Sequence, residues 1–132
     1  MNEKTSEVLT KANSAKNASV TLASLTSSVR DQALQAMADA LDKNVERILK
    51  ENQVDVDIAV QNQRTKAFID RLTLNEKRVK DMAEGLRSIM MLPDPIGETI
   101  SAWKRPNGLE IAQRRTPIGV IGIIYEARPN VT

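Results

Sequence analysis

The feature that most constrains this chain is a run of small and β-branched apolar residues, 118–124, followed at once by a polar loop. The polar and turn-forming residues of that loop are Glu126, Arg128, Pro129 and Asn130. A short, continuous apolar run bounded by turn formers is typical of a strand buried on both faces, as in parallel sheets. Ligands of open α/β sheets bind beyond the carboxyl ends of such strands, where this loop lies. The pattern therefore predicts a buried strand that leads into a ligand-binding loop.

A strand of this kind needs a neighbour, because its backbone donors and acceptors would otherwise be buried without partners. The sequence contains no second run of the same character. We therefore expect the chain to be the front part of something larger.

Residues 3–92 show the spacing of amphipathic helices, with apolar residues every three or four positions between Val29 and Leu49. We expect a first helix over 3–25, a break at 26–28, and a second stretch that pauses near 43–44 and resumes towards Val60. A loop over 61–66 and a short helical turn over 67–71 follow. Thr73 and Glu76 have the spacing of a capping box, which predicts a helix ending before Pro93.

Residues 94–116 change in character. Pro106-Asn107-Gly108 separates two strand-like runs, 99–104 and 109–115. Asn-Gly between such runs is a strong hairpin signal, since both residues tolerate positive φ. Trp103 on this hairpin is interpreted as a packing or interface anchor.

Composition excludes several classes of function. At 132 residues the chain is long enough for one domain with a core. Cysteine and histidine are absent, so the chain has no disulfide, thiolate nucleophile or imidazole base. The 19 basic and 17 acidic residues are interspersed, which predicts no nucleic-acid partner. No stretch approaches the roughly 20 apolar residues of a membrane span, and the polar start resembles no secretory signal, so a cytoplasmic protein is expected.

Arg128 and Asn130 are the candidate site residues. An arginine in this loop suits a carboxylate or phosphate, and the asparagine amide can donate to an oxyanion. Ordinary turn chemistry is an equally good interpretation. Glu126 is a weaker candidate base and is better explained as a surface charge.

Other motifs favour structural interpretations. Gly119 and Gly122 lie inside the apolar run, whereas the glycines of a dinucleotide fingerprint lie in the turn after a strand, so close packing is favoured. Asp55 and Asp57 are two apart on a helix and do not share a face. The pair at 114–115 is better explained as arginines on an exposed or edge strand than as a phosphate site.

Several segments together are similar to one family. They are 67–72 (AFIDRL), 92–97 (LPDPIG), 106–109 (PNGL) and 117–132, whose most specific part is 124–132 (IYEARPNVT). The chain resembles, over essentially its whole length, the γ-glutamyl phosphate reductases of the aldehyde dehydrogenase superfamily. The Pro-x-Gly-Val pattern at 117–120 is shared more widely in that superfamily.

The resemblance implies an α/β aldehyde dehydrogenase-like fold for the full-length protein. It implies that this part is mainly α-helical, with a hairpin and the first strand of the nucleotide-binding sheet. Residues 1–93 would be the helical part of the nucleotide-binding domain, 94–116 an oligomerisation hairpin, and 117–132 the first strand and active-site loop. The resemblance also implies that the protein forms a homo-oligomer.

The resemblance also implies a reaction: reduction of γ-glutamyl phosphate by NADPH to glutamate 5-semialdehyde in proline biosynthesis, through a thioacyl intermediate on a cysteine. This chain departs from the family pattern because it has no cysteine, so we expect it to be inactive alone. Arg128 or Asn130 would lie near the superfamily's oxyanion-stabilising asparagine, and no cofactor-binding or metal-binding residue is assigned. The alternative is a free-standing helical interaction module with a strand-donating tail.

Overall fold

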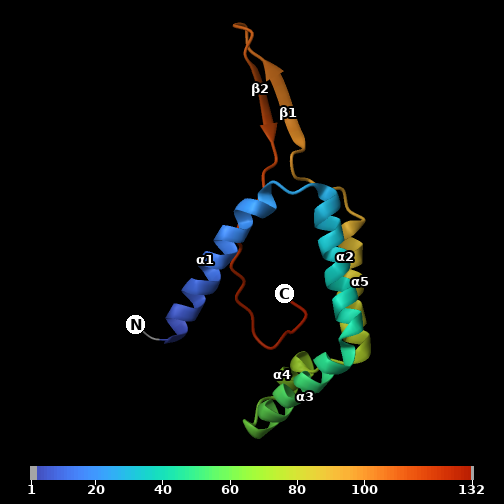
Figure 1. Cartoon of the computed structure of the whole chain (residues 1–132). Helices are drawn as coiled ribbons and strands as arrows, with labels where there is room; N and C mark the ends of the chain where they lie inside the picture. The colour runs from blue at the N-terminus through green and yellow to red at the C-terminus, as the bar shows by residue number, and fades with distance from the viewer. Residues whose placement is uncertain (1–2, 132) are drawn as a thin grey trace. The chain divides into compact units, whose positions relative to one another are not determined.

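The computed structural model describes residues 3–131. Met1 and Asn2 of the expected helical region 1–93, and Thr132 of the expected strand and loop region 117–132, lie outside the described part. The side chains of the first helix are described from Glu7 onward. The chain divides into two units. The first unit contains the N-terminal helix and residues 93–122, and the second contains residues 28–92 and the segment from Ile123. Figure 1 labels the helices and strands in chain order.

Four helices build the second unit. They are α2 (Ser27–Lys43), α3 (Val45–Gln61), α4 (Lys66–Leu72) and α5 (Glu76–Met90). The predicted pause in the long second stretch is confirmed, because α2 ends one residue before Asn44 and α3 begins one residue after it. Asn44 lies between the two helices, and its side-chain Nδ2 donates to the carbonyl of Ala40 in the last turn of α2 at 2.7 Å.

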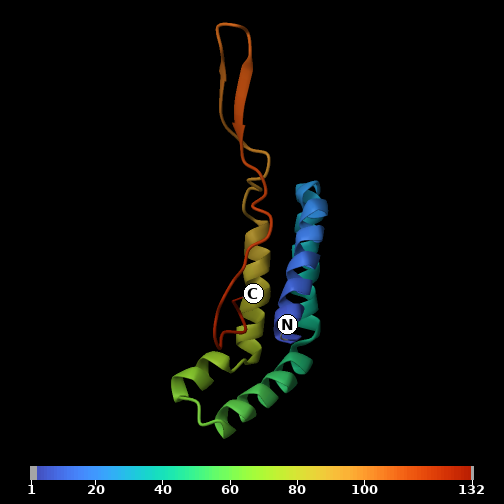
Figure 2. The same ribbon diagram turned by 90° about the vertical axis from the view of Figure 1, so that its left-hand side faces the viewer.

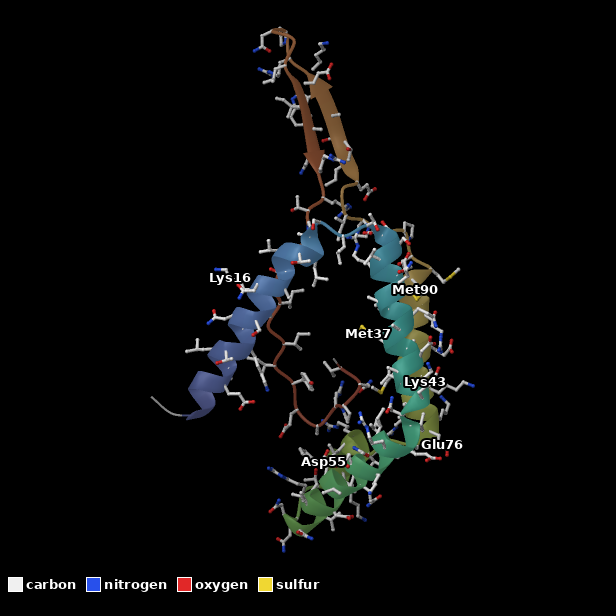
Figure 3. The ribbon with its side chains drawn as sticks, viewed as in Figure 1. Lys16, Met37, Lys43, Asp55, Glu76 and Met90 are labelled. Atoms are coloured by element: carbon white, nitrogen blue, oxygen red, sulfur yellow. The ribbon has the colours of Figure 1, made fainter. Side chains whose placement is uncertain are left out.

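Helices α2 and α5 lie side by side and antiparallel, as the two views in Figures 1 and 2 agree. Figure 3 shows Lys43 near the end of α2 and Glu76 at the start of α5 at the same end of the pair, with Met90 at the other end. An ion-pair cluster joins the two helices. Arg87 of α5 contacts Asp42 at 2.6 Å and Asp39 at 3.3 Å on α2. These contacts raise the pKa of the Arg87 guanidinium, mainly through its hydrogen bond to Asp42.

The core of this unit is small and made of small side chains. The buried apolar residues of the described chain are Ala38, Ala59, Val79 and Ala83. Each of the helices α2, α3 and α5 thus contributes at least one small buried side chain. The spacing of the sequence also predicts an apolar face of α5 formed by Val79, Met82, Leu86, Ile89 and Met90. Of these, Val79 is completely buried and Ile89 is 52% exposed, and the buried Ala83 lies outside that prediction.

One buried polar residue ties α3 to the link between α4 and α5. Asn52 is only 7% exposed. Its Nδ2 donates to the carbonyl of Leu72 at 2.9 Å, and its Oδ1 accepts from the amide of Leu74 at 2.7 Å. Both halves of the side-chain amide are therefore satisfied by the backbone, as burial of a polar group requires.

The predicted capping box at Thr73 and Glu76 is wrong. Asn75 is the N-cap of α5, and its side chain accepts from the amide of Arg78 at 2.8 Å. Thr73 instead ends α4, where its hydroxyl donates to the carbonyl of Ile69 at 2.7 Å. Asparagine is among the strongest N-cap residues, and a threonine beside it is free to satisfy the preceding helix.

The first unit contains one helix and one hairpin. Helix α1 runs over Glu3–Ala23, close to the predicted 3–25, and its described side chains are almost all exposed. The predicted hairpin is confirmed as β1 (Thr99–Lys104) and β2 (Glu110–Arg114), paired antiparallel. Trp103 lies opposite Ile111 and remains 47% exposed.

The hairpin turn contains two residues that tolerate positive φ, Asn107 and Gly108, but they do not both adopt it. Only Gly108 does, at +87°. The amide of Gly108 donates to the carbonyl of Arg105 at 2.9 Å, and that of Arg105 donates to the carbonyl of Leu109 at 2.8 Å. The loop is therefore a three-residue connection in which Pro106 opens the turn and glycine supplies the left-handed position.

The arginines at the base of the hairpin have structural partners. Arg114 donates from Nε and Nη2 to the carbonyl of Gly97 at 3.1 and 2.9 Å. The Nε of Arg115 contacts the carboxylate of Glu98 at 2.8 Å. These contacts favour the structural interpretation of the pair over a phosphate site.

The run 118–124 does not form the predicted buried strand. Its backbone joins no sheet, and its large side chains face solvent, with Ile118 85% and Ile124 103% exposed. The reason is that the two strands of the described chain pair with each other, which leaves this run without a neighbour. The favoured close-packing role of Gly119 is also wrong here. This glycine has a φ of +93°, and a side chain added at it would meet nothing within 4 Å. The same open space surrounds Gly122.

Candidate functional site

The candidate loop is a tight turn at the end of the exposed apolar run. Ala127 enters it with a φ of +50°, in the left-handed region. The amide of Val131 then donates to the carbonyl of Arg128 at 3.1 Å, which closes a turn with Pro129 and Asn130 at its two central positions. Proline fits the first of these positions because its φ is already fixed near the required value.

Arg128 and Asn130 flank the proline and are both exposed. In the described part of the chain, neither side chain takes part in a hydrogen bond or ion pair. The guanidinium of Arg128 is thus available to a phosphate or carboxylate, and the amide of Asn130 is available to an oxyanion. Glu126 is exposed as well, as expected for a surface charge.

Pro129 differs from its neighbours because it is partly buried. It lines a hollow of about 450 Å³ within the second unit. The other lining residues come from α3 and the link before α5: Arg47, Ile48, Glu51, Asn52, Asp55 and Leu74. The candidate loop and one face of α3 therefore share a single concave surface.

The two aspartates of α3 take different positions, as their spacing predicts. Asp55, labelled in Figure 3, lines the hollow. Asp57 does not, and its carboxylate accepts from Nε2 of Gln53 at 2.8 Å. The prediction that they do not share a face of the helix is confirmed.

Sequence reasoning missed the α3 residues of this hollow. Arg47, Glu51 and Asp55 are four residues apart, so they lie in one row along the helix. The spacing could have predicted that these three charged side chains share one face of the helix, but nothing in the sequence predicted that this face lies beside Pro129. Asn52 gave no signal, because burial of one asparagine in a polar helix is visible only in the fold.

Metal and membrane features are limited. The described residues contain no group of three or more His, Cys, Asp or Glu side chains placed to hold a metal ion. Within residues 3–131, no helix has the length and apolar character needed to cross a membrane.

Comparison with known proteins bears on the whole chain. No family model matches the sequence. A γ-glutamyl phosphate reductase of Heliobacterium modesticaldum is 54% identical over 127 residues, which is 96% of this chain and 30% of that protein. A second, from Carboxydothermus hydrogenoformans, is 54% identical over 126 residues with the same two shares.

A solved structure agrees in three dimensions. The crystal structure of a γ-glutamyl phosphate reductase from Thermotoga maritima matches with a TM-score of 0.91 and 41% identity, over 95% of this chain and 30% of that one. This chain matches the N-terminal part of the γ-glutamyl phosphate reductases. A member from Saccharomyces cerevisiae matches with a TM-score of 0.75 and 26% identity, over 80% of this chain.

The match is to part of each relative. The chain spans about 30% of the length of the relatives that it matches, and the matched part is the N-terminal one. The five helices and the hairpin of the described residues are thus the family's own elements.

Proposed function

We propose that this chain serves as the N-terminal part of an enzyme that reduces γ-glutamyl phosphate with NADPH to glutamate 5-semialdehyde in the cytoplasm. The observation that carries the proposal is 54% identity, maintained over 127 residues, to a protein named for that substrate. Glutamate 5-semialdehyde is a precursor of proline, so the reaction belongs to amino-acid biosynthesis. The proposal includes membership of the aldehyde dehydrogenase superfamily and an α/β fold for the longer protein.

Three regions would divide the work. Residues 1–93 would support the nucleotide-binding domain, the hairpin region 94–116 would join copies in a homo-oligomer, and 117–132 would supply the first strand and the active-site loop. The run 118–124 supports the last assignment, because its apolar side chains are exposed and its backbone is not paired with a neighbouring strand in the described chain. Nucleic acid and membrane have no place in this assignment.

Within the loop, Arg128 and Asn130 would contact the reacting end of the substrate. Arginine binds phosphate oxygens through two parallel N–H donors. An amide N–H placed at the acyl oxygen stabilises the negative charge that develops there during acyl transfer. Both groups are exposed and without side-chain partners in the described chain, as a substrate-binding role requires.

The residues present do not form a nicotinamide site. Gly119 and Gly122 lie inside the apolar run, whereas the glycines that bind a pyrophosphate lie in a turn that opens a helix. When bound, NADPH supplies the hydride. No residue of this chain is assigned to hold it.

The absence of cysteine leads to a direct test. The chain alone is expected to show no phosphate-dependent reduction of NADP with glutamate 5-semialdehyde, since it has no thiol to form the acyl intermediate. A chimera in which this chain replaces the matching part of the Thermotoga maritima protein is expected to be active. A folded, oligomeric chimera without activity would contradict the proposal.

The same chimera tests the loop. Asn130→Ala is expected to lower kcat about 100-fold or more if the amide stabilises an oxyanion. Arg128→Gln is expected to raise KM for phosphate. Glu126→Gln is the matched control and is expected to leave both parameters nearly unchanged. Equal effects of all three substitutions would indicate a structural role for the turn.

A second function is favoured by one observation. The exposed and unpaired run 118–124 is suited to strand addition at the edge of another protein's sheet, which would make the chain a helical interaction module. The two functions differ in their partner. An interaction module binds a foreign sheet and gives an inactive chimera, whereas an enzyme part restores catalysis.

A further inference from the structure

The hollow shared by α3 and the candidate loop has an apolar floor and a charged rim. Ile48, Leu74 and Pro129 are partly buried, whereas Arg47, Glu51 and Asp55 are exposed. The hollow has a volume of about 450 Å³ and is open to solvent on one side. The surface therefore offers apolar contact in its centre and opposite charges along one side.

The rim charges are not used by the fold. In the described part of the chain, the side chains of Arg47, Glu51 and Asp55 make no hydrogen bond or ion pair. Arg47 and Glu51 have the spacing of a helix ion pair, but arginine precedes glutamate, which is the weaker orientation. Elsewhere on the helices, Lys77 and Asp81 do pair at 2.7 Å. A cation and two carboxylates thus remain free beside the hollow.

We infer that this hollow is the subsite for the α-amino-acid end of the substrate. The α-carboxylate pairs with Arg47, the α-ammonium pairs with Glu51 or Asp55, and the methylene groups lie over Ile48 and Leu74. The inference rests on the proposed function, which supplies a γ-glutamyl group as the ligand. An ammonium and a carboxylate on one carbon match the mixed rim, which a plain phosphate or a simple aldehyde does not.

The position of the loop gives the ligand a direction. Pro129 lines the hollow, and Arg128 and Asn130 flank it in the chain. A glutamyl group anchored at the rim of α3 therefore extends its acyl phosphate towards the turn that carries both candidate groups. Asn52 forms part of the wall but not of the ligand shell, because both atoms of its amide are bound by the backbone of Leu72 and Leu74.

The test is a titration of the ¹⁵N-labelled 132-residue chain with L-glutamate. Binding of a small zwitterion at an exposed rim is expected in the millimolar range, which corresponds to a weak complex. Amide shifts are expected at Arg47, Glu51 and Asp55. Glutarate lacks the ammonium and 4-aminobutyrate lacks the α-carboxylate, so each is expected to bind roughly tenfold more weakly, because one charge-assisted contact is missing.

Two variants sharpen the result. Arg47→Gln is expected to weaken L-glutamate binding roughly tenfold and to leave 4-aminobutyrate unchanged. Lys50→Gln removes an exposed cation of the same helix that does not line the hollow, and it is expected to change neither. Circular dichroism verifies that both variants remain helical.

Equal shifts with all three ligands, no shifts at the rim, or an Arg47→Gln variant that binds like the parent would overturn the subsite. These results are separable from the proposed function. If the chimera is active but L-glutamate causes no amide shifts at the rim, the subsite is rejected and the proposed function is retained. Selective binding of L-glutamate with an inactive chimera would show an amino-acid site in this hollow, and it would reject both the proposed function and the role of the hollow in it.

Discussion

Two apolar segments of this chain have opposite fates. Helix α5 buries Val79 and Ala83 completely, whereas the run 118–124 leaves Ile118 and Ile124 almost fully exposed. The run is the more apolar of the two, so hydrophobicity does not explain the difference. The difference lies in where the backbone hydrogen bonds go. A helix satisfies its own amides within the segment, whereas a strand needs a second strand.

The comparison teaches which parts of a chain are complete by themselves. Helices α2–α5 find partners among nearby residues, and the hairpin pairs β1 with the next strand in sequence. The run 118–124 finds none among residues 3–131. A strand of a parallel sheet is joined to its neighbour by a crossover of a dozen or more residues, so it depends on distant chain.

Hydrogen exchange gives the largest expected contrast between the two segments. Amides of Val79 to Ala83 are expected to exchange at least about a hundredfold more slowly than those of 119–124, because opening a packed helix costs several kcal/mol and opening an unpaired segment costs nothing. The measurement is exchange followed by NMR at single-residue resolution. Strong protection of 119–124 in the monomer would show that the run has found a partner.

Substitution of a fully buried residue should break one side of the comparison. Val79→Asp is expected to lower the free energy of unfolding by about 3 kcal/mol or more, because it buries an unpaired carboxylate. Urea unfolding followed by circular dichroism measures this loss. Val54→Asp is the matched control on α3, where the side chain is 51% exposed, and its effect should stay near 0.5 kcal/mol. Similar losses in both variants would mean that α5 is not packed.

The two hydrogen bonds of Asn52 give a second test of the packed helices. Asn52→Ala leaves the carbonyl of Leu72 and the amide of Leu74 without their partner, which is expected to cost about 1–3 kcal/mol of unfolding free energy. Gln53→Ala, one residue later on α3, removes only an exposed contact to Asp57 and should cost less than about 0.5 kcal/mol. The idea fails if the two substitutions have the same unfolding midpoint.

The sequence predicted the elements whose signals are local. The helix break near Asn44, the apolar face of α5 and the hairpin around Gly108 all follow from spacing or turn chemistry over a few residues. The capping residue was misplaced by two positions. Thr73 and Asn75 are both good caps, and only the burial of the link between α4 and α5 decides between them.

The candidate site was predictable in part. The turn that carries Arg128 and Asn130 follows from Pro129, and exposure of both side chains agrees with its position after the apolar run. The hollow beneath Pro129 was not predictable, because Arg47, Glu51 and Asp55 lie more than seventy positions away in sequence. Only the fold of the second unit brings them to the same surface.

The smallest expected effect concerns an exposed ion pair of α1, where Lys11 contacts Glu7 at 2.7 Å. Its hydrogen bond lowers the pKa of Glu7 below 4.5 and raises the pKa of Lys11 above 10.5. The stabilisation is therefore complete between those two ordinary values. It is lost as pH falls through the lowered pKa of Glu7 or rises through the raised pKa of Lys11.

NMR titration of the Glu7 carboxyl group should show the lowered pKa in the parent chain and an ordinary value in Lys11→Gln. Helicity of α1 should decrease slightly below the pKa of Glu7 in the parent and stay level across that range in the variant. Because both side chains are well exposed, the change should shrink in high salt. A Glu7 pKa that is the same in both chains would show that α1 maintains its helix without this contact. The helix would then depend on the hydrogen bonds within its own segment.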